Sequence, residues 1–132
     1  MKDTYLREEK YRELYDTYLR GLGTQEFANQ NEAADWVRHQ PASCFFVSGK
    51  SLVNYIAEKR SGRVRTHFSL YSKKMELLYE RYMERYGSCP SDLSREAICE
   101  TLVNEAAPCF YTSREITLRA IQKERRRRRA RL

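Results

Sequence analysis

The segments KYRELYDTYLRGLG at residues 10–23 and KMELLYERYMERYG at residues 74–87 decide the fold of this 132-residue chain. At an offset of 64 residues they share a lysine, a leucine, two tyrosines and the final glycine. At an offset of 65 residues, ASCFFVS at 42–48 matches APCFYTS at 107–113. Because the matching motifs follow one another in the same order, we infer an internal duplication.

Each half is expected to contain three helices. In residues 10–23 and 74–87, apolar and aromatic residues recur every three or four positions, which is typical of an amphipathic helix. Gly23 and Gly87 stand where a helix often ends in a residue with positive φ. Second helices are predicted at about 30–39, opened by an Asn29–Glu32 capping box, and at about 93–105.

The third helices are predicted from Ser48 to about Arg60, and from a Thr112–Glu115 capping box into the arginine-rich end. No long alternating run favours strands, so the predicted fold is all-α. We expect a tandem duplication of a three-helix unit, about six helices in total, packed as one compact helical domain. The predicted parts are a first repeat at 1–62, a second at 63–122 and a C-terminal extension at 123–132, with the halves sharing one core because about 64 residues would be marginally stable alone.

The sequence argues against several classes of protein. No apolar run approaches the roughly 20 residues that span a bilayer, and charged residues rather than an apolar segment follow the N-terminus. The four cysteines form no Cys-x-x-Cys pair, so we expect reduced thiols in the cytoplasm. The expected location is cytoplasmic, on the nucleoid in a bacterium or in the nucleus in a eukaryote.

Positive charge is concentrated in two blocks. The chain has 25 Lys and Arg against 18 Asp and Glu, a net charge of +7, and residues 123–132 alone carry +6. The second block is Lys59, Arg60, Arg63 and Arg65, and both blocks lie at the C-terminal end of a predicted third helix. One or two cations suffice to favour a helix C-terminus, whereas five consecutive arginines repel one another. We therefore expect a polyanionic partner, whose phosphates such cations neutralise with release of counterions.

The second and third helices of each half form helix-turn-helix-like pairs, although their link is longer than usual and lacks glycine. This layout is similar to the tandem three-helix DNA-binding repeats of the Myb family, but that family's tryptophan spacing is absent, since Trp36 is the only tryptophan. The predicted nucleic-acid-binding residues are Lys50, Asn54, Lys59, Arg60, Arg63, Arg65, Arg114, Arg119, Gln122, Lys123, Arg125, Arg126, Arg127, Arg128, Arg129 and Arg131.

Tyrosine accounts for ten residues, most of them on the apolar stripes of the long helices, where packing is the expected role. The same stripes suit pairing of helices within the chain, with a second copy or with a protein partner. An alternative function is therefore a helical scaffold, or a subunit of a larger assembly, whose tail docks on an acidic partner.

No motif for catalysis, a metal or a cofactor is expected. Ser48-Gly49-Lys50-Ser51 lacks the upstream glycine of a P-loop. The two histidines have no acid pair, and no spacing fits a zinc site, so Cys44 and Cys109 are interpreted as core residues. We expect a non-enzymatic accessory protein that binds nucleic acid, DNA rather than RNA, through the phosphate backbone and without a membrane partner.

Overall fold

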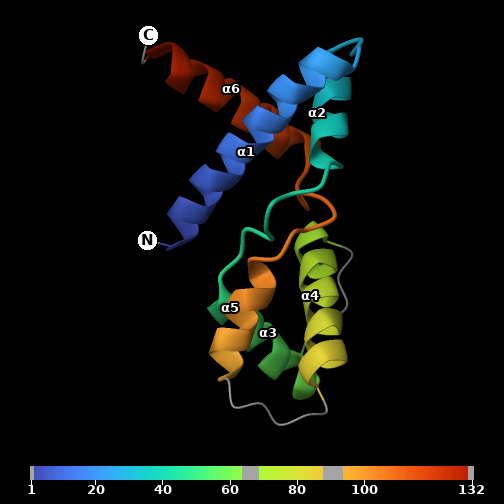
Figure 1. Ribbon diagram of the computed structural model, residues 1–132, viewed down its shortest axis with the longest axis vertical. Coiled ribbons are helices and arrows are strands. Elements are labelled where there is room, and N and C mark those ends of the chain that lie inside the picture. Colours follow the sequence, from blue (N-terminus) through green and yellow to red (C-terminus); the bar gives the residue numbers. More distant parts are fainter. Residues whose placement is uncertain (1, 64–68, 88–93, 131–132) are drawn as a thin grey trace. The chain divides into compact units, whose positions relative to one another are not determined.

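The computed structural model describes residues 2–63, 69–87 and 94–130, and this part of the chain is helical (Figure 1). The only β-type pairing in these residues is an isolated bridge between Ala42 and Ala107. The predicted all-α class is confirmed. The helices are α1 (Lys2–Thr24), α2 (Gln30–Arg38), α3 (Gly49–Arg60), α4 (Leu70–Tyr86), α5 (Arg95–Val103) and α6 (Arg114–Ala130). Over the described residues, none of them combines the length and apolarity that crossing a membrane requires.

Helix boundaries follow local capping chemistry. The Asn29 side chain accepts a hydrogen bond from the Glu32 amide at 2.9 Å, as the predicted capping box requires. The capping box predicted at Thr112 is wrong. Ser113 accepts the Ile116 amide at 3.2 Å instead, and the buried Thr112 hydroxyl has no hydrogen-bond partner.

The glycines predicted at the ends of the long helices do not have the expected positive φ. Gly87 is the C-cap of α4, as predicted, but has a φ of −64°, and Gly23 lies inside α1, one residue before its end. A positive φ of 74° occurs instead at Gly62, in the turn after α3. The α-helical φ is open to any residue, so the sequence position of a glycine does not by itself define its backbone conformation.

The helices form two compact units. The first contains α1, α2 and α6, and the second, built from residues 43–106, contains α3, α4 and α5. Each unit thus combines the first two helices of one half of the sequence with the third helix of the other half. The ranges expected from the repeat, 1–62 and 63–122, would instead place α3 with α1 and α2, and α6 with α4 and α5.

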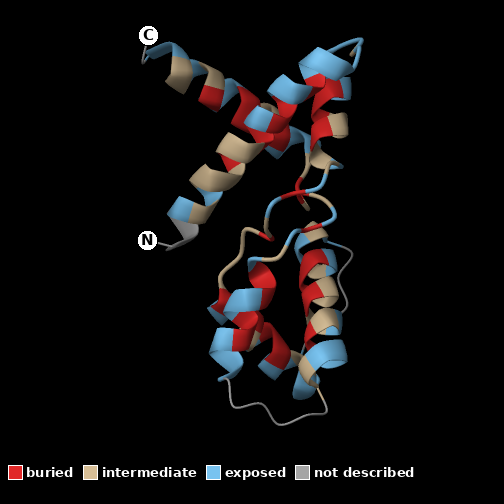
Figure 2. Cartoon of the chain, in the orientation of Figure 1, coloured by how far each residue is buried: buried red, intermediate tan, exposed pale blue. Residues whose placement is uncertain are grey.

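The first unit has its core where the three helices meet (Figure 2). Tyrosines and a leucine on one side of α1 face small and apolar residues of α2 and α6. A fully buried leucine or isoleucine side chain stabilises the fold by about 1.5–3 kcal/mol. The main buried residues are Tyr11, Leu14, Tyr15, Tyr18, Ala34, Val37, Ala120 and Ile121.

The second unit has a similar core, to which α3 contributes Leu52 and Ile56, and α4 contributes Met75 and Leu78. Cys99 of α5 is also fully buried, and burial raises the pKa of its thiol to about 11. That thiol is therefore a packing group rather than a reactive one.

The segments before α3 and α6 have matching conformations. Phe45 and Phe110 are each 2% exposed, and the next residue in each segment has positive φ, 52° at Phe46 and 50° at Tyr111. The Phe45 amide donates to the Val103 carbonyl at 3.0 Å, and the Phe110 amide donates to the Arg38 carbonyl at 3.2 Å. The two donors, Phe45 and Phe110, are 65 residues apart, and so are the two acceptors, Arg38 and Val103. The matched motifs therefore have the same local fold.

Candidate nucleic-acid interface

Helix α6 contains the predicted arginine run as a continuous part of the helix. Its buried side is formed by Thr117, Ala120, Ile121 and Glu124. The helical repeat of 3.6 residues places a second set of residues together on the opposite side. This set is exposed and is called the cationic face below; it consists of Arg119, Gln122, Lys123, Arg126 and Arg129.

Two other arginines of α6 pack against α1 within the same unit. Arg125 donates a hydrogen bond to the Tyr18 hydroxyl at 3.3 Å, and its Cζ lies 5.9 Å from the centre of that ring. Arg128 lies over Tyr15, 4.6 Å from the ring centroid, and pairs with Asp16 at 2.9 Å. Cation–π contacts of this kind contribute about 0.5–2 kcal/mol. These two residues, called the anchoring arginines below, hold the C-terminal turns of α6 against α1.

A third arginine compensates a buried acid. The Glu124 side chain is 3% exposed, and Arg127 Nη1 lies 3.4 Å from its Oε2. An isolated buried carboxylate would be strongly destabilising, so the unit needs a cation at this place. Arg131, also predicted to bind nucleic acid, lies outside the described residues.

The first residue of α6 is held by α2. Arg114 donates to both carboxylate oxygens of Asp35, with Nε 3.0 Å from Oδ1, and Arg38 Nε lies 3.0 Å from the same oxygen. The hydrogen bonds from Arg114, and then from Arg38, lower the pKa of Asp35 to about 2. Arg114 therefore has an intramolecular partner, although its side chain is 46% exposed.

The second basic block lies at the end of α3, in the second unit. Lys59 Nζ is 2.6 Å from both carboxylate oxygens of Glu76, which also accepts a hydrogen bond from Tyr55. Burial opposes ionisation of Glu76, but these hydrogen bonds outweigh it and lower its pKa. Burial and the Glu76 carboxylate raise the pKa of Tyr55. Lys59 thus forms an intramolecular ion pair with Glu76.

The other predicted residues of the second unit are more accessible. Arg60 is exposed and lies over Tyr82, with its Cζ 5.9 Å from the ring centroid. Lys50 and Asn54 are exposed one turn apart on α3, and Arg63 is exposed after the helix. Arg65 lies outside the described residues.

Several tyrosines of the stripes pack inside their own units, although Tyr71 is 52% exposed. Tyr11, Tyr15, Tyr18 and Tyr82 are between 5% and 8% exposed, as expected for packing residues. Sequence reasoning missed that basic side chains cover them, including Lys123, whose Nζ lies 5.7 Å from the centre of the Tyr11 ring. A signal was present, since Tyr18 and Arg125 match Tyr82 and Arg60 in the repeat.

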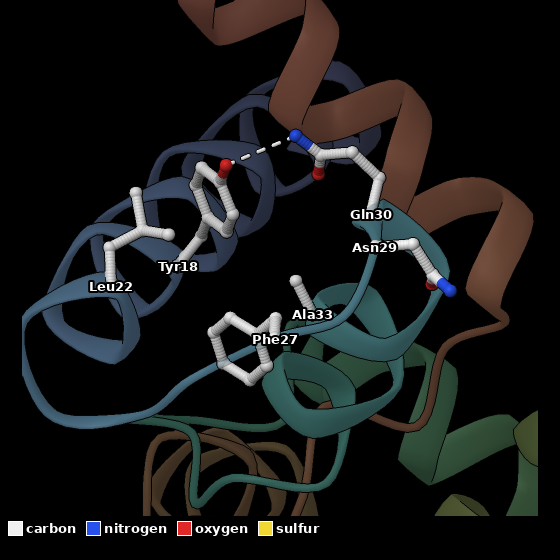
Figure 3. A pocket seen from close by; sticks show the side chains of 6 residues that line it. All are labelled: Tyr18, Leu22, Phe27, Asn29, Gln30 and Ala33. Atoms are coloured by element: carbon white, nitrogen blue, oxygen red, sulfur yellow. Dashed lines mark hydrogen bonds between the residues drawn. The ribbon is translucent and has the colours of Figure 1, made fainter.

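A pocket of about 260 Å³ opens between the C-terminal part of α1 and the start of α2 (Figure 3). Its wall is apolar on the side of Leu22, Phe27 and Ala33. On the other side Gln30 donates a hydrogen bond to the Tyr18 hydroxyl at 3.1 Å. Tyr18 accepts from Arg125 as well, so the same hydroxyl connects the pocket wall to α6.

No arrangement of the described residues matches a metal site or a phosphate loop. No group of three or more His, Cys, Asp or Glu side chains is close enough there to hold a metal ion. At the start of α3, the Gly49 amide donates to Glu100 Oε2 at 3.2 Å. The Glu100 carboxylate thus accepts the hydrogen bond that this amide would donate to a phosphate in a phosphate-binding loop.

Comparison with known proteins identified no matching family model, no similar curated protein and no similar solved structure.

Proposed function

We propose that this chain is a small, non-enzymatic accessory protein that binds nucleic acid, DNA in preference to RNA, through the phosphate backbone. The cationic face makes the main contacts, together with Arg131, and Arg60 and Arg63 provide a second, weaker site. The observation that carries the proposal is that the basic residues of α6 fall into two groups, one that packs within the unit and one that is exposed. Arg125, Arg127 and Arg128 contact groups of their own unit, whereas Arg119, Arg126 and Arg129 are exposed together on the opposite side, beside Lys123.

The cationic face lowers the stability of the folded chain when no partner neutralises its charge. Arg119, Lys123, Arg126 and Arg129 have like charges and lie within one side of a single helix, where they repel one another. Packing does not require the charge of Arg119, Arg126 and Arg129, because these side chains are exposed, whereas Lys123 also lies over the Tyr11 ring. A row of phosphates would neutralise them and release condensed counterions, which is the main source of backbone affinity in protein–DNA complexes.

We also propose that the two halves arose by tandem duplication. Support comes from the matched positive φ values of Phe46 and Tyr111 and from the matched contacts of Arg60 and Arg125 with tyrosine. In each unit the second helix of one half packs on the third helix of the other half, α2 on α6 and α5 on α3. The helix-turn-helix-like pairs would then be formed between halves rather than within them.

The test compares two triple variants of equal net charge. Arg119, Arg126 and Arg129 are changed to Ser in the first, and the exposed Arg7, Lys73 and Arg95 in the control. Each is titrated against fluorescent duplex DNA at two salt concentrations. The first is expected to lose at least tenfold in affinity and to show a salt slope smaller by about 2–3, since each phosphate contact contributes about 0.9. Equal behaviour of the two variants would overturn the proposal.

The alternative, a protein scaffold, is favoured by one observation. Leu19 and Leu22 of α1 are 42% and 52% exposed, and Leu22 lines the pocket of Figure 3. Sizing of the purified protein before and after nuclease treatment distinguishes the two functions. A nuclease-insensitive oligomer, together with unchanged DNA affinity in the cationic-face variant, supports the scaffold. Co-purifying nucleic acid that nuclease removes supports the first proposal.

A further inference from the structure

The cationic face extends along most of α6, on the side away from its buried residues. In Figure 1 the C-terminal half of the helix continues past its crossing with α1 toward the C-terminus. From Arg119 to Arg129 the cationic face is about 15 Å long, at 1.5 Å per residue. A helix with its side chains is about 10–12 Å across, and the major groove of B-form DNA is about 12 Å wide.

Gln122 is the one uncharged member of the cationic face. It lies one turn from Arg119 and one turn from Arg126, so cations border it along the helix on both sides. A glutamine amide is unsuited to neutralising phosphate but can pair with the N6 and N7 edge of adenine. Arginine can bind the O6 and N7 edge of guanine in the same groove.

We propose that the cationic face enters the major groove of duplex DNA, where Gln122 and Arg126 contact purine edges. Arg119, Lys123 and Arg129 contact the phosphates that border the groove. This inference rests on the proposed function and goes beyond it, because backbone contacts alone carry no base information. A-form RNA is a poor alternative ligand for the same face, since its major groove is deep and narrow.

The anchoring arginines make such readout feasible. A free arginine-rich segment would have to become ordered on binding, which reduces affinity and precision. Arg125 and Arg128 instead fix the last turns of α6 on Tyr18 and Tyr15 before any ligand arrives. The side chains of the cationic face are then presented from a defined helix.

The experiment uses the full chain and begins with selection from a random duplex DNA library. Affinity is then measured for the selected duplex, a scrambled duplex, the selected sequence with 7-deazapurines, and the same sequence as duplex RNA. We expect about tenfold weaker binding to the scrambled, 7-deaza and RNA duplexes. The 7-deaza bases remove the N7 acceptor from the major groove and leave the phosphates unchanged.

Variants assign the effect to α6. Gln122→Ala is expected to reduce the preference for the selected duplex about tenfold while the salt slope stays the same. Gln25→Ala, at an exposed residue after α1, is the matched control and should retain the preference. Because Gln122 is exposed, its removal leaves the fold intact, which circular dichroism verifies.

The outcomes separate the two proposals. Equal affinity for all four duplexes, with the loss of binding in the cationic-face variant, overturns base readout and leaves backbone binding standing. Equal effects of Gln122→Ala and Gln25→Ala also overturn base readout by Gln122. An unchanged affinity of the cationic-face triple variant overturns the proposed function itself.

Discussion

The guanidinium of Arg125 lies over the ring of Tyr18 and donates a hydrogen bond to its hydroxyl, with Cζ 5.9 Å from the ring centroid. Arg60 lies over Tyr82 at the same 5.9 Å in the other unit. These four residues match in the sequence repeat. A basic residue at the end of each third helix is therefore partly a packing residue, and its charge alone does not assign it to a ligand.

The two neighbours Arg125 and Arg126 should differ in their effect on stability. Arg125→Ala removes a cation–π contact and a hydrogen bond, so we expect the free energy of unfolding to fall by about 1–2 kcal/mol. Arg126→Ala changes an exposed residue and should stay within about 0.5 kcal/mol of the parent. Urea denaturation followed by circular dichroism measures both. Equal destabilisation by the two changes would contradict the role given to Tyr18.

Removing an acid next to the basic helix should strengthen DNA binding. Asp16 is 59% exposed and pairs with Arg128, which is 42% exposed. Asp16→Asn releases that charge, so we expect affinity to rise a few-fold and the salt slope to steepen by up to about 0.9. The lost ion pair should cost at most about 1 kcal/mol of stability. Glu26→Gln makes the same charge change at an exposed residue after α1, and an equal gain there would show a general charge effect only.

The helices could be predicted from the sequence because their signals are local. Apolar periodicity gave α1 and α4, and the Asn29 cap opens α2 as expected. The pairing of third helices could not be predicted, because α3 and α6 bury matching positions of the repeat, 52, 55 and 56 in α3 and 117, 120 and 121 in α6. In a run of identical arginines, residue type does not distinguish Arg125 from Arg126, and the match of Arg125 with Arg60 in the repeat is the one sequence signal that does. The orientation of α6 on α1 then separates packed from exposed side chains.

Gly49 should be intolerant of any side chain. A Cβ built there would lie 2.8 Å from the backbone nitrogen of Glu100 and 2.9 Å from its Cα. Gly49→Ala is therefore expected to destabilise the second unit by about 1–3 kcal/mol, the usual effect of overpacking. At Gly23, inside α1, nothing lies within 4 Å of such a Cβ, so Gly23→Ala should stabilise by about 0.5–1 kcal/mol. Thermal unfolding of the two variants checks the opposite signs.

The Asp35–Arg114 contact should make stability depend on pH in the acid range. Asp35 has a pKa of about 2 in the folded chain, below that of an aspartate in the unfolded chain. Ionisation of Asp35 therefore stabilises the folded state, and its contribution to the free energy of unfolding is fully present above about pH 4. It is lost as the pH falls through the folded pKa near 2. Asp35→Asn lacks the contribution at every pH, so the free energy of unfolding of the parent chain should fall toward that of the variant between pH 4 and pH 2. Urea denaturation at steps of pH measures the difference between the two chains, and a difference that stays constant over this range would refute the assigned role of Arg114.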